Sequence, residues 1–256
     1  MHVLDYDGYL LDLDGTVYRG NEVIPEAVTF INWLIKEQKK FLFVTNNSSK
    51  TPKQAVDKLN SMSIPAKREH IFTSALMAAY HVQQLADRPK SAYIIGSTGL
   101  KVALEEVGII EQDVDPDVVI VGIDRTFTYD KLEKASLAIQ EGAKLIATNG
   151  DKMIPTERGS VPGNGSIVAA IEAASGTQAE IVGKPNPRFI KQAVSLLHTS
   201  PRRTLMIGDN YDTDILAGIH ANVATLHIDT GVTRYRDVQA KEIQPTHLIR
   251  SFTELF

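Results

Sequence analysis

Short apolar runs alternate with longer amphipathic stretches along almost the whole chain. Each run is soon followed by Gly, Asn or Asp, a pattern typical of strands that are buried on both faces of a parallel sheet. The stretches between the runs repeat apolar residues at helical spacing, so the sequence predicts an α/β protein with a mainly parallel sheet. The expected strands cover residues 9–11, 41–44, 92–95, 118–121, 145–147, 205–207 and 224–228. The expected helices cover residues 53–62, 100–107, 129–141, 166–175 and 187–198.

The composition excludes several classes of protein. A chain of 256 residues forms one large domain or two modest ones, and its net charge of −4 lacks the basic stripe of a nucleic-acid-binding protein. The absence of cysteine excludes disulfides, thiolate metal sites and a cysteine nucleophile. No apolar run approaches the roughly 18 residues that span a bilayer, and the N-terminus does not resemble a signal peptide. We therefore expect a cytoplasmic protein without nucleic-acid or membrane partners.

Two carboxylates follow the first apolar run. Asp12 and Asp14 stand where this predicted strand ends, at the edge of a parallel sheet where reactive groups gather. Gly15 permits the backbone to curl, so both carboxylates can flank a site where one attacks a phosphate ester and the other transfers protons. Taken alone, the segment is equally compatible with a plain turn. Asp5 and Asp7 have the same spacing but too little chain before them for an anchored strand, and we reject them as the nucleophile.

Two further strand ends carry groups that suit a phosphate site. Thr45 opens the polar segment 45–49, whose hydroxyl and backbone N–H groups could form an anion-binding nest, although a plain loop with a helix cap is the simpler interpretation in isolation. Lys184 stands between Gly183 and Pro185, and its ammonium can neutralise a transferring phosphoryl group. Most lysines are solvated surface residues, but this one follows a predicted strand and precedes a predicted helix.

A second acidic cluster follows the run 205–207. Asp209 comes just after this strand and is the best placed ligand for Mg²⁺, which prefers a few carboxylate oxygens completed by phosphate and water. Asp214 lies further along the next helix and is expected to hold a metal-bound water or to orient Lys184. Asp212 is expected to face solvent or to cap the helix.

Together and in this order, these segments resemble the motifs of the haloacid dehalogenase (HAD) superfamily of phosphohydrolases. The matching segments are DLDGT at 12–16, VTNNS at 44–48, GKP at 183–185 and GDNYDTD at 208–214. The resemblance extends over the whole chain to the NagD-like branch, which includes p-nitrophenyl phosphatase-type and acid sugar phosphatase proteins. It implies a Rossmann-like, doubly wound parallel-sheet core with an inserted α/β cap domain.

The resemblance also implies roles for the residues that meet the substrate. Asp12 is the nucleophile, and Asp14 is the general acid and base. Asp14, Thr45, Asn46 and Lys184 contact the phosphate of the substrate, and Lys184 also stabilises charge during catalysis.

Mg²⁺ is the cofactor that the resemblance implies. Its ligands are Asp12, the backbone carbonyl of Asp14, and Asp209, with assistance from Asp214. Asp14 is the second aspartate of the first motif. Its presence favours phosphate over halide chemistry, because a halide leaving group needs no acid. An ion-pumping ATPase of the same superfamily would need membrane helices, and the sequence has no apolar run long enough to form one.

The long interval between Thr45 and Lys184 leaves room for the cap. We expect a catalytic core of residues 1–76 and 183–256 and a cap of residues 77–182 that selects the substrate. The substrate is a small phosphate ester, namely a sugar acid phosphate, a sugar phosphate or a nucleotide monophosphate. Caps of this type take part in dimer contacts in the family, so the resemblance leans toward a homodimer and leaves the oligomeric state open.

Two other functions compete with hydrolysis. A phosphomutase of the same superfamily would yield an isomeric phosphate instead of inorganic phosphate. A catalytically idle binding module would have no need for Asp14.

In the expected cap, Asn149, Asp151 and Arg158 are candidates for leaving-group contacts, with solvated surface as the simpler interpretation. The loop 162–166 either touches the substrate or cofactor or is a flexible turn in which Ser166 caps the next helix.

Overall fold

The computed structural model describes residues 1–156 and 159–256, which form two compact units. Unit 1 comprises Met1–Thr45, Ala55–Phe72 and Lys184–Phe256. Unit 2 comprises Asn46–Gln54 and Thr73–Gly183. None of the helices that the structure describes combines the length and the apolar character needed to cross a bilayer.

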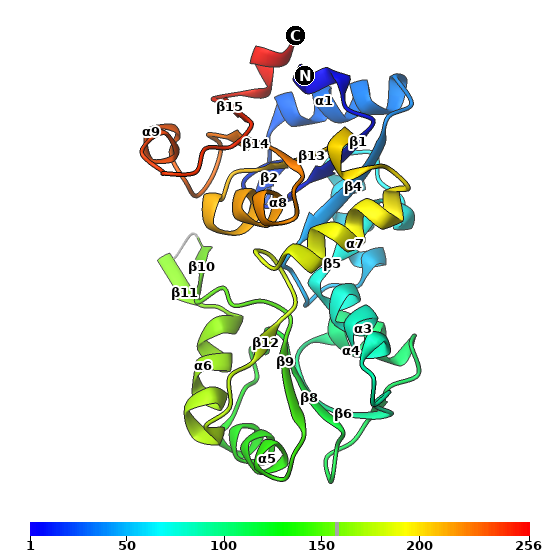
Figure 1. Cartoon of the computed structure of the whole chain (residues 1–256), viewed down its shortest axis with the longest axis vertical. Helices are drawn as coiled ribbons and strands as arrows, with labels where there is room; N and C mark the ends of the chain where they lie inside the picture. The colour runs from blue at the N-terminus through cyan, green and yellow to red at the C-terminus, as the bar shows by residue number, and fades with distance from the viewer. Residues whose placement is uncertain (157–158) are drawn as a thin grey trace. The chain divides into compact units, whose positions relative to one another are not determined.

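Unit 1 is built on a sheet with the strand order β15-β14-β13-β1-β4-β5 (Figure 1). Its strands are β1 (Gly8–Leu11), β4 (Lys40–Thr45), β5 (Ile71–Thr73), β13 (Thr204–Gly208), β14 (Ala224–Ile228) and β15 (His247–Ile249). β1 pairs in parallel with both β4 and β13, and the parallel pairing continues through β14 to β15. The chain thus moves from β1 to one side of the sheet and later returns to the other side, as in doubly wound folds.

The pairing register aligns the carboxyl ends of the central strands. Leu11 of β1 lies opposite both Ile207 of β13 and Phe43 of β4. The backbone N–H of Asp12 continues the ladder by donating to the Ile207 carbonyl at 2.9 Å. The polar segments that follow these three strands therefore emerge at one edge of the sheet.

Amphipathic helices complete unit 1. α1 has a proline in its first turn, where a missing N–H breaks no helical hydrogen bond, and it buries apolar side chains at helical spacing. α7 begins after Asn186, whose side chain accepts from the backbone N–H of Arg188. The helical elements are η1 (Val3–Asp5), α1 (Pro25–Lys36), α2 (Pro52–Ser61, shared with unit 2), η2 (Arg68–His70), α7 (Pro187–Leu197), η3 (Pro201–Arg203), the π-helical turn η4 (Tyr211–Ile215), α8 (Leu216–His220), α9 (Tyr235–Gln239) and η5 (Phe252–Leu255). An antiparallel hairpin pairs β2 (Tyr18–Arg19) with β3 (Glu22–Val23).

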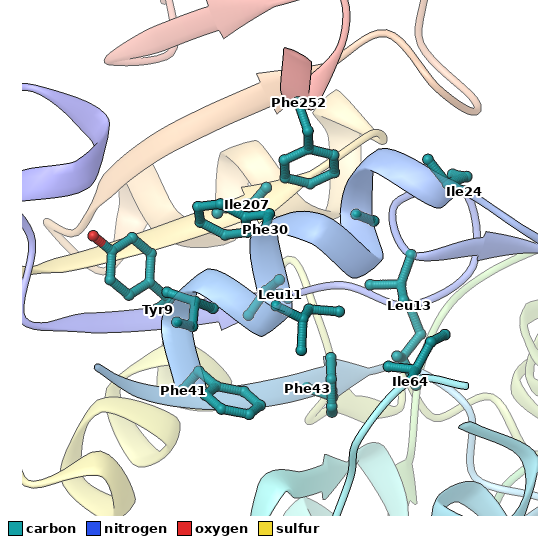
Figure 2. Packing of buried hydrophobic residues seen from close by; sticks show 14 of the residues in the cluster. Tyr9, Leu11, Leu13, Ile24, Phe30, Phe41, Phe43, Ile64, Ile207 and Phe252 are labelled. Carbon is teal, nitrogen blue, oxygen red and sulfur yellow. The ribbon is translucent and has the colours of Figure 1, made fainter. Parts of the chain in front are cut away.

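Aromatic residues fill the core between α1 and the sheet (Figure 2). The Phe30 ring lies edge-to-face with Tyr9 at 5.7 Å and stacks on Phe252 at 5.2 Å. The Tyr9 hydroxyl donates to the Val3 carbonyl at 3.0 Å, so the polar atom of this buried ring has a partner. This packing fixes β1, the strand that ends at the first predicted carboxylate.

Unit 2 contains a second parallel sheet, with the strand order β12-β9-β8-β6-β7. Helices α5 and α6 pack on one face of it, and α3 and α4 pack together on the other side (Figure 1). The elements are α3 (Ser74–Gln84), β6 (Ser91–Ile95), α4 (Thr98–Glu105), β7 (Ile110–Glu111), β8 (Val118–Val121), α5 (Tyr129–Gln140), β9 (Lys144–Ala147), the antiparallel pair β10 (Met153–Thr156) and β11 (Gly159–Pro162), α6 (Asn164–Ser175) and β12 (Glu180–Ile181). The predicted fold class, a doubly wound α/β core with an inserted α/β unit, is confirmed.

Asp117 links the starts of β6 and β8. Its Oδ2 accepts from the backbone N–H groups of Lys90 and Ser91, at 2.7 and 2.9 Å, and from the Ser91 hydroxyl at 3.1 Å. The two backbone donors lower the pKa of the Asp117 carboxyl, because they bind its charged form.

We expect Asp117→Asn to destabilise unit 2 by about 1 kcal/mol at pH 7, the contribution of an ordinary hydrogen bond at a solvent-accessible group. A carboxyl with a lowered folded pKa contributes stability that is present above its unfolded pKa of about 3.9 and is lost as the pH falls through the folded pKa. The difference from wild type should therefore shrink at pH 3. Urea unfolding at both pH values measures it, with Asp115→Asn, which removes the same charge from an exposed neighbour, as the control. Equal losses in the two variants at pH 7 would contradict the role of Asp117.

Candidate active site

Asp12 and Asp209 follow the neighbouring strands β1 and β13. Both side chains are buried, with exposed fractions of 8% for Asp12 and 1% for Asp209. A buried carboxylate costs free energy unless it is hydrogen-bonded or paired with a cation. The partners of these two groups therefore decide what the site can do.

Asp209 is held from several directions. The Thr16 hydroxyl donates to its Oδ1 at 3.0 Å, and the backbone N–H of Val232 donates to its Oδ2 at 2.7 Å. The Asp209 backbone carbonyl accepts from the N–H of Thr233 at 3.1 Å and lies 3.0 Å from Nε2 of His227. These contacts fix both the backbone and the carboxylate of Asp209.

Two glycines leave room for this carboxylate. A Cβ at Gly15 would lie 2.4 Å from Oδ2 of Asp209, and a Cβ at Gly231 would lie 1.9 Å from the same atom. Gly15 also has a φ of +96°, in the region that favours glycine. The predicted curl at Gly15 is thus present, and the close approach of Asp209 is a second reason for glycine there.

Lys184 joins two of the carboxylates. Its ammonium lies 2.6 Å from Oδ1 of Asp12 and 2.7 Å from Oδ1 of Asp214, and it donates to the Val44 carbonyl at 3.0 Å. Asp214 is itself fixed by the backbone N–H of Asn210, which donates to its Oδ2 at 3.1 Å. Because Lys184 is only 2% exposed, the alternative of a solvated surface lysine is wrong.

Three carboxylates share this small volume with one ammonium. One oxygen each of Asp12, Asp209 and Asp214 lies within 4.8 Å of the others. Burial, followed by the Asp214 charge, raises the pKa of Asp209 to about 6. Burial raises the pKa of Asp12 well above its usual value, although the Lys184 ammonium opposes this shift. Burial acts to lower the pKa of Lys184, but the two adjacent carboxylates outweigh it and raise that pKa. The raised pKa values of Asp12 and Asp209 mean that their charged forms are unfavourable without a further cation, and carboxylate oxygen atoms are the donors that Mg²⁺ prefers.

Asp14 has a different environment from Asp12. Leu13 between them is buried in the core, and its carbonyl accepts from the backbone N–H of Val17 at 2.8 Å as the chain turns. The Asp14 carboxylate is exposed and accepts from the backbone N–H of Gly20, in the turn between β2 and β3, at 3.4 Å. Two carboxyl groups in such unlike environments suit two different chemical roles.

The second motif is divided between the two units. Thr45 ends β4, is buried and belongs to unit 1 together with the carboxylates. Asn46 belongs to unit 2, where its side-chain amide donates to Oδ2 of Asp151 at 3.1 Å. The structure therefore groups Asp12, Lys184 and Thr45 in one unit and Asn46 in the other.

Two other acidic residues of unit 1, Asp7 and Asp212, form ion pairs on the surface. Asp7, rejected as a nucleophile, forms an ion pair with Arg203 at 2.8 Å. Asp212 is exposed, as expected, and pairs with Lys241 at 3.3 Å. Of the two alternatives expected for Asp212, solvent exposure is therefore confirmed, and the cap of η4 is Asn210, whose side chain accepts from the backbone N–H of Asp212 at 3.0 Å.

The predictions for unit 2 need corrections. Asn149 is buried and Asp151 is partly buried, so the solvated-surface interpretation is wrong for both. Ser166 does not cap α6, because that helix begins before it and the Ser166 hydroxyl donates to the Lys152 carbonyl at 2.7 Å. Arg158 lies outside the described residues.

Sequence reasoning missed the partners of Asp209. Thr16 lies inside the first motif, and its hydroxyl donates to Asp209. Gly231 and Val232 follow the run 224–228. The polar residues and the glycine that come just after this run were the available signal for a contact with the site. Nothing in the sequence marked His227 as a partner of Asp209, since an isolated histidine in a buried strand is common.

The fold and the buried acidic group identify the family of this chain. The family model described as Haloacid dehalogenase-like hydrolase matches residues 9–110, and a second model, described as HAD-hydrolase-like, matches residues 181–255. The chain belongs to the HAD-like hydrolase family.

Individual relatives narrow the family to phosphatases. The chain is 47% identical over 249 residues to 5'-nucleotidase YutF of Bacillus subtilis, covering 97% of each chain. It is 44% identical over 252 residues to an acid sugar phosphatase of Staphylococcus epidermidis, covering 98% of this chain and 95% of the relative. A solved mutant of the thermostable p-nitrophenylphosphatase from Bacillus stearothermophilus matches with a TM-score of 0.88 at 49% identity, over 98% of each chain. The chain is an HAD-family phosphatase, and the predicted resemblance to the NagD-like branch is confirmed.

Proposed function

We propose that the chain is a Mg²⁺-dependent phosphomonoester hydrolase that acts on small phosphorylated metabolites through an aspartyl-phosphate intermediate on Asp12. The observation that carries this proposal is the buried group at the strand ends. One oxygen each of Asp12, Asp209 and Asp214 lies within 4.8 Å of the others, the Lys184 ammonium pairs with Asp12 and Asp214, and burial raises the pKa values of Asp12 and Asp209. Three buried carboxyl groups with a single ammonium support a site for a divalent cation, because a bound cation would favour their charged forms.

The residues present fit Mg²⁺. Asp12, Asp209 and the backbone carbonyl of Asp14 would hold the ion, with assistance from Asp214. Carboxylate and carbonyl oxygens are the ligands that this hard cation selects over nitrogen or sulfur. When bound, it supplies charge neutralisation between a carboxylate nucleophile and a dianionic phosphate.

Asp12 and Asp14 divide the chemistry between them. A carboxylate oxygen of Asp12 attacks phosphorus, and the bond between phosphorus and the ester oxygen breaks. Asp14 donates a proton to the departing alkoxide and then, as a carboxylate, takes a proton from water. The resulting hydroxide attacks the acyl phosphate, inorganic phosphate leaves, and the Asp12 carboxylate is regenerated.

Binding of the phosphoryl group is assigned to Thr45, Asn46, Asp14 and Lys184. A hydroxyl, an amide and an ammonium together offer donors to the phosphoryl oxygens, and Asp14 can donate while it is protonated. The burial of Lys184 supports its role in charge stabilisation, because a charge acts more strongly where water is excluded.

The substrate is assigned only as a class. The names of the relatives mention a nucleotidase and a sugar phosphatase, which supports nucleotide monophosphates, sugar phosphates and sugar acid phosphates as candidates. We assign residues 1–76 and 183–256 to a catalytic core and residues 77–182 to a cap that selects among them. The two compact units support this division, with the difference that residues 46–54, 73–76 and 183 belong to unit 2. A cytoplasmic location and a homodimer remain predictions.

Phosphate release from a panel of phosphomonoesters, with Mg²⁺ and with excess EDTA, tests the proposal. We expect release that requires Mg²⁺. We also expect a rise in unfolding free energy of about 2.7 kcal/mol when Mg²⁺ is present at a hundred times its Kd. Asp209→Asn should lose both effects. An isomeric phosphate product would favour a mutase, and EDTA-resistant release would contradict metal dependence.

A further inference from the structure

Unit 2 holds Asn46 in place, although Thr45, the residue before it in the second motif, belongs to unit 1. The Asn46 carbonyl accepts from the Ser74 hydroxyl at 2.6 Å and from the side-chain amide of Asn149 at 2.9 Å. The Asn46 side-chain amide donates to Oδ2 of Asp151 at 3.1 Å. Residues of unit 2 therefore fix both the backbone and the side chain of Asn46.

The residues after Asn46 occupy the edge where a parallel sheet usually binds its ligand. In unit 2 the chain runs from β6 to the edge strand β7 and then to β8 on the other side of β6, which places a topological switch point at the carboxyl ends of β6 and β8. Ser48 is 1% exposed there, and a Cβ at Gly122 would lie 2.7 Å from its hydroxyl. The backbone N–H of Gly99, in the first turn of α4, donates to the Ser49 carbonyl at 3.0 Å. This edge of unit 2 is thus filled by the segment that begins at Asn46.

A buried network at the start of α6 holds Asp151. Its backbone N–H donates to Oδ1 of Asn149 at 3.1 Å, and its carbonyl accepts from the backbone N–H of Gly165 at 2.9 Å. Asn164, which is 2% exposed, donates to the Asn149 carbonyl at 2.8 Å. A Cβ at Gly165 would lie 2.3 Å from the carbonyl oxygen of Gly150, so the close approach of loop and helix requires glycine. The Asp151 carboxylate is therefore presented to Asn46 by a fixed backbone.

We propose that Asp151 is a positioning residue that orients the Asn46 side chain for phosphate binding. The proposal rests on the proposed function, in which Asn46 binds the phosphoryl group. A carboxylate only accepts hydrogen bonds, whereas an amide has a donor end and an acceptor end. The bond to Asp151 fixes which end of the Asn46 amide carries the N–H groups. The amide nitrogen of Asn46 carries two N–H groups, so in this proposal it donates to Asp151 and to a phosphoryl oxygen, whereas the opposite orientation would turn the acceptor oxygen toward both anions.

A double-mutant cycle with inorganic phosphate as the competitive inhibitor tests this proposal on the full-length enzyme with Mg²⁺. We expect Asn46→Ala and Asp151→Ala each to raise the phosphate Ki about tenfold, the effect of losing one hydrogen bond to a charged group. The variant that combines both changes should also show about a tenfold effect, because Asp151 acts through Asn46. An Asp151 that contacted the ligand itself would give additive effects of about a hundredfold.

Further variants separate positioning from a loss of structure. Asp151→Asn has the same shape and should raise Ki less than Asp151→Ala, because its side-chain oxygen can still accept once the amide rotates. Asp113→Ala removes an exposed carboxylate of unit 2 that pairs with Lys134, and it should leave Ki unchanged. The Mg²⁺ concentration for half-maximal activity should be the same in all these variants.

Three results would overturn the proposal. Additive effects of Asn46→Ala and Asp151→Ala would assign Asp151 a separate role, and an unchanged Ki in Asp151→Ala would remove its role altogether. An unchanged Ki in Asn46→Ala would overturn both the phosphate-binding role of Asn46 and this proposal, while leaving the nucleophile untouched. Failure of the proposed function itself has a different signature, which is full turnover in Asp12→Asn.

Discussion

A folded protein without measurable turnover is the expected result of replacing Asp12 by asparagine. The amide has nearly the same shape and keeps an oxygen that can accept from the Lys184 ammonium, which lies 2.6 Å from Oδ1 of Asp12. It lacks the carboxylate oxygen that would attack phosphorus. The kcat for p-nitrophenyl phosphate should fall by about 10⁴-fold to 10⁶-fold, as in other hydrolases that lose their nucleophile. Phosphate release measured with saturating Mg²⁺ gives this number.

The stability of Asp12→Asn separates a chemical from a structural role. Burial raises the pKa of Asp12 well above its usual value, so the charged carboxylate is unfavourable there without metal, and Lys184 keeps Asp214 as a partner when Asp12 is replaced by a neutral amide. The metal-free variant should therefore unfold at the same temperature as wild type or higher. Turnover in this variant, with deamidation excluded by mass spectrometry, would rule out Asp12 as the nucleophile. A variant that fails to fold would show that the Asp12 charge is needed for structure.

The inner strands of both sheets were predictable because they are buried on both faces, whereas the short edge strands β5, β7 and β15 were not predicted. The run 118–121 became β8 (Val118–Val121), every residue of which is buried, so no polar position interrupts the apolar signal. Helix starts were less accurate. α4 begins at Thr98, whereas the apolar spacing predicted a start at Leu100, because the first turn of a helix is fixed by its backbone and cap and not by its apolar stripe.

The site was predictable only where it follows strand ends. Asp12 and Asp209 come directly after β1 and β13, and the parallel register of these strands brings both carboxylates to one edge. The contacts that orient Asp209 could not be predicted, since Val232 reaches it through a backbone N–H that no residue type encodes. The membership of Asn46 in unit 2 was equally hidden. It depends on contacts with Ser74 and Asn149, which local sequence patterns do not report.

Lys184→Met should cause the largest loss of stability of any substitution considered for this site. The side chain keeps its approximate length but leaves Asp12 and Asp214 buried without their cation, and loss of one partner of a buried ion pair typically costs about 3–5 kcal/mol. Urea unfolding in EDTA measures this loss. Lys134→Met is the matched control, because Lys134 pairs with Asp113 at the same 2.6 Å distance but on the surface, where an ion pair contributes little.

The cause of the Lys184→Met loss can be isolated with a second substitution. If uncompensated negative charge destabilises the variant, the addition of Asp12→Asn should recover part of the lost stability, because only two buried carboxylates then remain. Mg²⁺ should also restore stability to Lys184→Met, since it binds the same oxygens, but it should not restore stability to Lys134→Met. A loss in Lys184→Met as small as that of the control would mean that protons already neutralise the carboxylates in the metal-free protein. In that case the Lys184 ammonium would not be what balances their charge.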